Sequence, residues 1–381
     1  MNQYYNPVRT IQGAGCVEEI GALLRSQVSE GAQILLLAWN ESVFELPAFA
    51  ALDDTYSVHK VCFNESNPTV EQLFDLFCQT RDCIPAFVIA VGGGSIMDVG
   101  KALCCLYGKE IADTDALRRI ISNKEYGIPA ARWIGVPTTA GTGSETTCWA
   151  TIWDPTKDCK RSIESRDNYA WAALVDPDLA AGMPIGLAVS SALDAMAHAV
   201  ESYWARATNC VSRALALQAV RIIMGAMDDL LDGKPQAHDA MAQGSMLAGL
   251  AFSNTKTTAC HSISYPLTIH YHIPHGAAVS LLLAPMLAVN AAKITDLSAL
   301  LDALQVRSAD ELEDRIRGYL ARAGLPVSLE AWGVRWEDLH HLAALGLTPG
   351  RADNNPVDIN PEMIETILEK VYSTYEMSKG A

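Results

Sequence analysis

The stretch of sequence that decides the fold is residues 86–98, Ala-Phe-Val-Ile-Ala-Val-Gly-Gly-Gly-Ser-Ile-Met-Asp. Its first six residues are apolar without polar alternation, which is typical of a parallel strand covered on both faces. Three glycines end this strand, and a helical pattern opens at Ile96. A glycine turn can simply pack tightly, but at the carboxyl end of a strand in an open sheet its N–H groups suit a phosphate. We therefore expect a strand, a phosphate-binding turn and a helix.

The same alternation extends in both directions from this stretch. Further strands are expected at residues 33–38, 133–136 and 172–175, and helices at residues 17–28 and 69–80. This order predicts an α/β amino-terminal Rossmann-like domain with a parallel sheet over residues 1–182. Beyond Met183, alanine, leucine and methionine recur every three to four residues and strand patterns nearly vanish. We expect residues 183–381 to form an all-α carboxyl-terminal domain.

Composition restricts the class of protein. The chain has 381 residues, 50% hydrophobic and 19% charged, so it can bury a core and is neither disordered nor fibrous. Acidic residues exceed basic ones by 44 − 28 = 16, which disfavours nucleic acid and anionic membranes as partners. The amino-terminal residues lack a secretory pattern, and the apolar run 277–289 is shorter than the ~20 residues that span a bilayer. With ten irregularly spaced cysteines, we expect reduced thiols and a cytoplasmic protein.

A second polar loop follows the strand expected at residues 133–136. Residues 137–145 read Pro-Thr-Thr-Ala-Gly-Thr-Gly-Ser-Glu, with four hydroxyls and two glycines in nine residues. In isolation such a tract is usually a solvated loop. Beside the glycine turn it indicates a diphosphate-linked cofactor, because two phosphate-compatible turns then lie at strand ends of one sheet.

One aspartate and three histidines form a candidate metal site in the second half of the chain. Asp194 and His198 are four residues apart, so a helix places both on one face. His261 lies in a helix-like stretch, and His275 precedes Gly276 at the start of another helix. A lone Asp-x-x-x-His pair is more often structural, but oxygen and imidazole donors together suit iron, zinc or nickel.

These motifs together resemble the iron-containing, metal-dependent (group III) alcohol dehydrogenases. The resemblance rests on residues 92–102, 137–145, 194–201 and 274–276, and it extends to Asn355-Pro356. It implies a dinucleotide-binding domain followed by a helical metal-binding and substrate domain, and a homodimer. It also implies that Asp194, His198, His261 and His275 hold one divalent metal, Fe²⁺ or Zn²⁺.

The resemblance also assigns cofactor contacts. The residues expected to bind the dinucleotide are Trp39, Asn40, Gly93, Gly94, Ser95, Asp98, Thr138, Thr139, Thr142, Thr147, Lys160 and Leu179. Many family members carry, after the strand at 33–38, an aspartate that excludes NADP, whereas this chain has Trp39-Asn40-Glu41. Because this turn holds no cation for a 2′-phosphate and Glu41 adds negative charge, we favour NAD(H) over NADP(H).

Two departures from the family pattern concern catalysis. Where members commonly carry a second histidine four residues after the third ligand, this chain has Tyr265. Proton transfer is therefore assigned to Tyr265, His272 or metal-bound water, with plain packing of Tyr265 as the alternative. The run 252–261 carries Lys256, Thr257 and Thr258 where small neutral residues are usual.

This run looks like the branch that reduces phosphonoacetaldehyde or sulfoacetaldehyde. A cation and hydroxyl donors near a metal ligand suit the anionic group of such a substrate. We expect Lys256 to act in catalysis through substrate binding, with further substrate contacts from Thr257, Thr258, Trp149 and Thr151. A solvent-facing Lys256 is the alternative.

The resulting hypothesis is an NAD(P)H-dependent reductase of a small anionic aldehyde. A general short-chain alcohol or 1,2-diol dehydrogenase is the first alternative. A dehydroquinate-synthase-like lyase shares the glycine turn and the metal, and a protein that binds both without turnover is a further possibility.

Overall fold

The computed structural model describes residues 3–157 and 159–373, which form two compact units. An α/β unit contains residues 6–139 and 143–180, and a helical unit contains 181–373 with the short segments 3–5 and 140–142. The division after residue 180 lies two residues from the predicted boundary. The predicted fold class is confirmed, because a parallel sheet is followed by a helical region.

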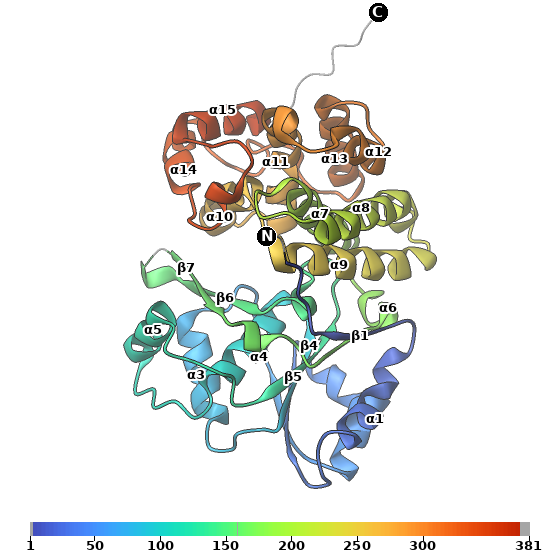
Figure 1. Ribbon diagram of the computed structural model, residues 1–381, viewed down its shortest axis with the longest axis vertical. Helices are drawn as coiled ribbons and strands as arrows, with labels where there is room; N and C mark the ends of the chain where they lie inside the picture. Colours follow the sequence, from blue (N-terminus) through green and yellow to red (C-terminus); the bar gives the residue numbers. More distant parts are fainter. Residues whose placement is uncertain (1–2, 158, 374–381) are drawn as a thin grey trace, which may run out of the picture. The chain divides into compact units, whose positions relative to one another are not determined.

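The α/β unit is built on six parallel strands in the order β1-β8-β5-β4-β2-β3. From one edge these are β1 (Arg9–Gln12), β8 (Ala172–Val175), β5 (Arg132–Pro137), β4 (Phe87–Gly92), β2 (Gln33–Ala38) and β3 (Ser57–Cys62). The crossover helices are α1 (Ile20–Arg25), α2 (Pro47–Ala50), α3 (Val70–Thr80), α4 (Gly94–Leu106) and α5 (Thr114–Asn123), and the short helix α6 (Pro177–Ala180) follows β8. Helix α1 covers one face of the sheet, and α3 to α5 lie on the other (Figure 1).

The strands at the centre of the sheet are buried on both faces. Along β2, Ile34 and Leu36 join the core formed with α1 and α2, whereas Leu35 and Leu37 join the core formed with α3 and α4. Successive side chains of a strand point to opposite faces, so an unbroken apolar run is required here. This is why these strands are predictable from sequence.

The carboxyl ends of β2 and β4 adjoin at the point where the strand order reverses. From β2 the chain proceeds to the edge strand β3, whereas from β4 it proceeds to β5 on the other side. The N–H of Trp39 donates to the carbonyl of Val91 at 3.2 Å. Residues 39–40 and the glycine turn therefore share the edge at which open α/β sheets bind ligands.

Two antiparallel strands not predicted from sequence complete the α/β unit. They are β6 (Trp149–Asp154) and β7 (Cys159–Glu164), which pair from Trp149↔Glu164 to Asp154↔Cys159. Strands β1 and β3 were also not predicted. All four carry polar or charged residues, so none shows the continuous apolar run of the sheet centre.

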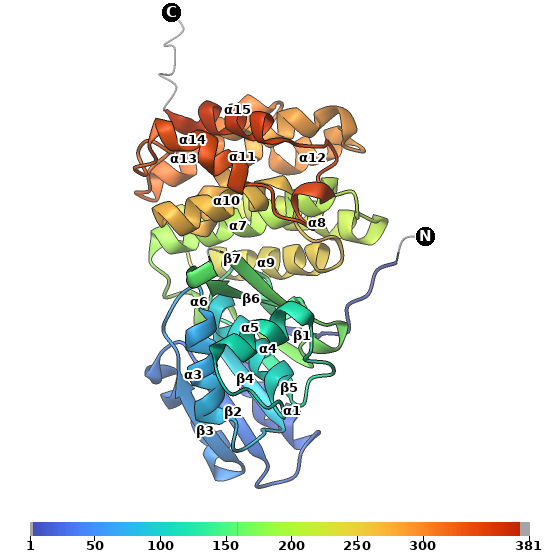
Figure 2. The same cartoon turned by 90° about the vertical axis from the view of Figure 1, so that its left-hand side faces the viewer.

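The helical unit packs around one long buried helix. This is α7 (Ile185–Trp204), which contacts α8 (Cys210–Leu231), α9 (Gln236–Thr255) and α11 (His275–Asn290). The remaining helices are α10 (Ala259–Tyr271), α12 (Leu297–Leu304), α13 (Ala309–Arg322), α14 (Leu339–Leu345) and α15 (Pro361–Tyr372). Within this unit α10 and α11 lie between α7 and the last helices of the chain (Figure 2).

Two stretches in this unit are long and apolar enough to cross a membrane by composition alone. They are Cys210–Leu231 and His275–Lys293, whose most apolar windows are 44% and 72% buried within the protein. Both helices supply residues to the core of the helical unit, which accounts for their apolar composition.

Candidate functional site

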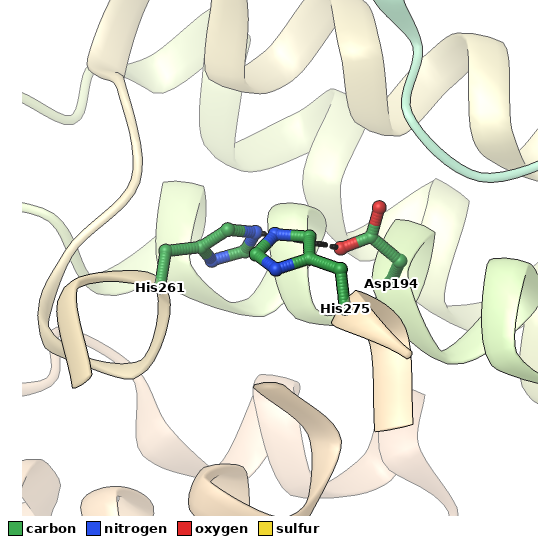
Figure 3. Close-up of side chains that lie close together, drawn as sticks. All are labelled: Asp194, His261 and His275. Atoms are coloured by element: carbon green, nitrogen blue, oxygen red, sulfur yellow. Dashed lines mark ion pairs between the residues drawn. The ribbon is translucent and has the colours of Figure 1, made fainter. Parts of the chain in front are cut away.

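Three helices bring one carboxylate and two imidazoles together in the helical unit. Asp194 comes from α7, His261 from the first turn of α10 and His275 from the first residue of α11 (Figure 3). The Oδ1 atom of Asp194 lies 3.5 Å from Nε2 of His261 and 3.9 Å from Nε2 of His275. One donor atom from each of the three residues lies within 4.8 Å of the others.

This cluster fits a divalent cation. Asp194 Oδ1, His261 Nε2 and His198 Nδ1 are buried and have no hydrogen-bond partner, although buried polar atoms normally have one. Donors ~2.1 Å from a shared ion lie about 3–3.5 Å apart, slightly closer than those found here. One oxygen and several imidazole nitrogens are the donor set of iron and zinc sites.

His198 lies at the same site. Its Nδ1 is 3.8 Å from Oδ2 of Asp194, and its ring stacks between Phe252 at 4.1 Å and His261 at 4.4 Å between ring centres. It is not among the three residues whose donors converge. The pair Asp194 and His198 is therefore adjacent as its spacing predicts, and ligation by His198 stays a prediction.

Gly276 allows α11 to approach α7. A Cβ atom at this position would lie 1.9 Å from the carbonyl oxygen of Ser190 and 3.0 Å from Cβ of Asp194. No larger residue fits without moving the backbone, so the His275-Gly276 pair is a requirement of the site. Only this close approach brings His275 to within reach of Asp194.

A second carboxylate orients His261. Glu201 is fully buried on α7, and one of its oxygens accepts hydrogen bonds from the Thr258 hydroxyl and the Cys260 N–H, both at 2.7 Å. Its other oxygen pairs with Nδ1 of His261. Because Nδ1 faces Glu201, Nε2 is left for the ion, which is the arrangement that metal-binding histidines usually have.

The charges at the cluster are mutually stabilised. Burial favours the neutral form of Asp194, but His198, His275 and His261 outweigh burial and lower the pKa of this carboxyl. Burial likewise favours neutral His261, but Glu201 and Asp194 raise the pKa of its imidazole. Both carboxylates, Asp194 and Glu201, are therefore ionised, and a divalent ion would bind Nε2 of His261 in place of its proton.

The remaining residues predicted for catalysis lie around α10. The ring of Tyr265 stacks almost parallel on His275, at 5.9 Å between ring centres and 11° between planes. His272 is exposed at the carboxyl end of α10. Lys256 is half-buried between α9 and α10, and Thr257 is buried beside it.

Thr258 has an internal role that the sequence did not indicate. It is fully buried, and its hydroxyl accepts from Nε1 of Trp204 at 2.9 Å while it donates to Glu201. This hydroxyl is therefore committed to supporting His261. The structure does not support the substrate contact predicted for Thr258.

The glycine turn is formed as the sequence predicts. Gly92 ends β4, Gly93 precedes α4, and Gly94 and Ser95 begin that helix. A Cβ atom on Gly92 would come within 2.4 Å of the Ile96 side chain, so only glycine fits. The Thr138 N–H donates to the carbonyl of Gly92 at 3.0 Å, which joins the second polar loop to this turn.

A buried lysine, missed in the sequence, fixes the second loop to α4. The Lys101 ammonium is fully buried and contacts Ser144 Oγ at 2.7 Å, Thr147 Oγ1 at 3.0 Å and the Trp149 carbonyl at 3.0 Å. These three acceptors match the three protons of an ammonium. Asp98 lies 3.7 Å from the ammonium. Burial lowers the pKa of Lys101. In the sequence, the signal that could have revealed this buried lysine is its position three residues, or one helical turn, after Asp98.

Asp98 and Thr147 belong to this internal network. Asp98 accepts from the Ser144 hydroxyl at 3.1 Å and the Thr151 N–H at 3.0 Å. The Thr147 hydroxyl contacts Lys101 and the carbonyl of Ser144. Cofactor contact is therefore not supported for Thr147, whereas the carboxylate of Asp98, 16% exposed, retains capacity to accept further hydrogen bonds.

The other residues predicted to bind ligands are placed as follows. Thr139 adjoins Gly93, Trp39 and Asn40 follow β2, Lys160 is on β7, and Leu179 is on α6. Trp149 and Thr151, which were predicted to contact substrate, lie on β6 of the α/β unit. Thr142 lies in the segment 140–142 that belongs with the helical unit.

Glu145, in the second loop, should make stability depend on pH. It is 2% exposed, and burial raises the pKa of its carboxyl from 4.5 to about 7. Between these two pKa values the folded protein keeps a proton on Glu145 that the unfolded chain releases. The free energy of unfolding therefore falls as pH rises through this range, by roughly 3 kcal/mol in total. Glu145→Gln should remove this loss and be more stable than wild type above pH 7. Urea unfolding from pH 4.5 to 8 measures it, and parallel profiles for the two proteins would contradict it.

Comparisons with known proteins agree with this geometry. The family model described as iron-containing alcohol dehydrogenase matches residues 7–177, and that of the Fe-containing alcohol dehydrogenase family, C-terminal, matches residues 188–372. Lactaldehyde reductase of Escherichia coli (strain K12) is 27% identical over 93% of this chain and 96% of its own. Phosphonoacetaldehyde reductase of Streptomyces viridochromogenes is 30% identical over 84% of each chain.

A solved structure gives the same result for the fold. Sulfoacetaldehyde reductase from Bifidobacterium kashiwanohense, in complex with NAD⁺, aligns with a TM-score of 0.86 and 25% identity, covering 98% of this chain and 100% of its own. The two family models together cover most of the chain, and the convergent Asp194, His261 and His275 could hold a metal ion. The chain therefore belongs to the iron-containing alcohol dehydrogenase family and is an alcohol or aldehyde oxidoreductase.

Proposed function

We propose that this enzyme reduces a small anionic aldehyde, sulfoacetaldehyde or phosphonoacetaldehyde, to the primary alcohol with NADH. The observation that carries the proposal is the place of Lys256 between α9 and α10, five residues before His261. A cation there suits the tetrahedral anionic group of a two-carbon aldehyde. The likeness to a phosphonoacetaldehyde reductase and a sulfoacetaldehyde reductase supports the same substrate class.

The protein's own residues would bind and orient the reactants. Asp194, His261 and His275, with His198 as the predicted fourth ligand, would hold the divalent ion. When bound, that ion supplies a Lewis acid for the carbonyl oxygen and the reduced nicotinamide supplies the hydride. Lys256 would bind the anionic tail and so present one face of the carbonyl to the hydride, which is an effect of orientation.

Tyr265 is our candidate for the proton donor. Its ring lies against His275, the most exposed of the convergent ligands, with 34% of the imidazole side chain accessible. Tyr265 is itself buried, and a phenol next to this ligand can donate a proton to the substrate oxygen on reduction. His272 is exposed at the end of α10 and is the second candidate.

The cofactor preference rests on the turn after β2. The side-chain oxygen of Asn40 accepts from the N–H of Ser42 at 2.8 Å, and Trp39 is exposed beside it. With Glu41 in this turn and no cation in it, NADPH should bind less tightly than NADH. The donor set suits Fe²⁺ and Zn²⁺ alike, so metal analysis of the purified enzyme is needed to choose between them.

Steady-state kinetics with sulfoacetaldehyde, phosphonoacetaldehyde and lactaldehyde, each with NADH and NADPH, test this function. We expect the higher kcat/KM with an anionic aldehyde and NADH. A general short-chain alcohol or 1,2-diol dehydrogenase is the second candidate, favoured by the likeness to lactaldehyde reductase over 93% of the chain. A higher kcat/KM for lactaldehyde than for both anionic aldehydes would establish that candidate instead.

Lys256→Ala is the sharpest variant for the substrate class. Loss of a charge-assisted contact of about 1.5–3 kcal/mol should lower the ratio of kcat/KM for the anionic aldehyde to that for propanal by roughly 10- to 100-fold. The fall should arise mainly in KM, because the ammonium binds the tail and not the reacting carbonyl. An unchanged ratio would show that Lys256 does not recognise the anion.

A further inference from the structure

The backbone of Lys256 is in a conformation that ordinarily requires glycine. Its φ is 61° and its ψ is 179°. Four other non-glycine residues with positive φ have the ordinary left-handed ψ of 27° to 61°, namely Lys124, His272, Asp296 and Gln305. The region at ψ near 180° is essentially restricted to glycine, and a side chain there is strained.

Asn354 holds the backbone before and after this residue. It lies in the short 3₁₀ helix Ala352–Asn354, about a hundred residues further along the chain. Its amide nitrogen donates to the carbonyl of Thr255 at 2.8 Å and to the carbonyl of Thr257 at 3.0 Å. Its amide oxygen accepts from the N–H of Ala207 at 3.1 Å, so both ends of this side chain are engaged.

Contacts made before and after Lys256 in the chain also connect it to residues of the candidate metal site. The Lys256 N–H donates to the carbonyl of Phe252 at 2.8 Å, and the ring of Phe252 stacks on His198. Two residues after Lys256, Thr258 donates to Glu201, which pairs with His261. Movement of the backbone at 256 is therefore limited relative to the metal ligands.

We propose that Asn354 is a positioning residue that fixes Lys256 beside the metal site and thereby sets selectivity for anionic substrates. A glycine at position 256 would adopt this backbone without strain, so a lysine is unfavourable there for stability alone. Such strain persists where surrounding contacts hold the backbone in place, and it is common at residues that have a function. The hydrogen bonds from Asn354 supply that constraint. The substrate part of this inference rests on the proposed function.

Asn354→Asp is the informative variant, because it keeps the oxygen that accepts from Ala207 and replaces the nitrogen that donates to both carbonyls. We expect the ratio of kcat/KM for the anionic aldehyde to that for propanal to fall at least roughly fivefold, the equivalent of ~1 kcal/mol. In a Lys256→Ala background the same change should leave the ratio where Lys256→Ala alone puts it. The exposed neighbour Asp353→Ala is the control. Equal losses with both aldehydes would show a merely structural role and overturn the proposal.

The two hydrogen bonds from Asn354 to the carbonyls of Thr255 and Thr257 are called the clamp below. Thermal unfolding tests the clamp without any substrate. Lys256→Gly relieves the strain and should melt above Lys256→Ala, which keeps the Cβ atom, by ~1–3 °C for a protein of this size. Asn354→Asp should lower the melting temperature more in the Lys256→Gly background than in wild type. In wild type, loss of the clamp also lets Lys256 leave its strained backbone conformation, which offsets part of the destabilisation. Glycine has no such strain to lose. Equal melting of Lys256→Gly and Lys256→Ala, or additive effects of the double change, would refute the clamp. If the clamp holds but wild type does not prefer anionic aldehydes, the proposed substrate class fails and not the clamp.

Discussion

His261→Ala should abolish bound metal and turnover together. His261 presents its unpartnered Nε2 to Asp194 from inside the protein, where its side chain is 3% exposed. Truncation to alanine removes this donor nitrogen. Loss of Lewis-acid assistance of several kcal/mol lowers turnover at least about a thousandfold, because each ~1.4 kcal/mol is a factor of ten.

Metal analysis of the purified protein and steady-state kinetics measure this effect side by side. His270→Ala is the matched control, since His270 lies on the same helix and is exposed. The control should retain both metal and activity. A His261→Ala protein that keeps a full equivalent of metal would remove His261 from the ligand set.

Glu201→Gln should weaken metal binding by roughly 10- to 100-fold, the usual effect of losing the group that orients a ligand. The hydrogen bonds around Glu201 have a fixed direction, because Trp204 donates to Thr258, and Thr258 and Cys260 donate to Glu201. Glutamine can keep only one oxygen. If its NH₂ group faces His261, Nδ1 must accept and the proton moves to Nε2, the atom that the ion needs.

The opposite orientation of glutamine is also unfavourable. Its NH₂ group would then face the N–H of Cys260, so two donors would meet in a buried place where an unmade hydrogen bond costs about 1–3 kcal/mol. Competition with a chelator measures the metal dissociation constant directly. Glu145→Gln is the same change at a buried glutamate of the α/β unit and should leave that constant unaltered. Equal affinities for wild type and Glu201→Gln would exclude the orienting role.

Much of the fold could be predicted because burial leaves a pattern in the chain. Strands β2, β4, β5 and β8 are buried and accordingly apolar, apart from the exposed first residues Gln33 of β2 and Arg132 of β5. Strands β6 and β7 form a separate two-stranded sheet and mix polar with apolar residues, so no such pattern marks them. The glycine turn was predictable for a related reason, since Gly92 leaves no room for a side chain.

The candidate site divides in the same way. Asp194, His261 and His275 could be proposed from residue type and motif, and their side chains do converge. Glu201 and Asn354 could not, because a glutamate or an asparagine on a helix is ordinarily a surface residue. Their roles arise from contacts across 60 and about 100 positions of the chain.

The sequence by itself determined the central strands β2, β4, β5 and β8, the glycine turn and the candidate metal donors, since these depend on local pattern and residue type. Only the tertiary structure decided which polar groups support the donors. It buried Lys101 against three acceptors, committed Thr258 to Glu201 and held Lys256 in a glycine-like backbone. The physical reason is that a buried polar group is stable only when its partners are in place, and those partners come from distant parts of the chain.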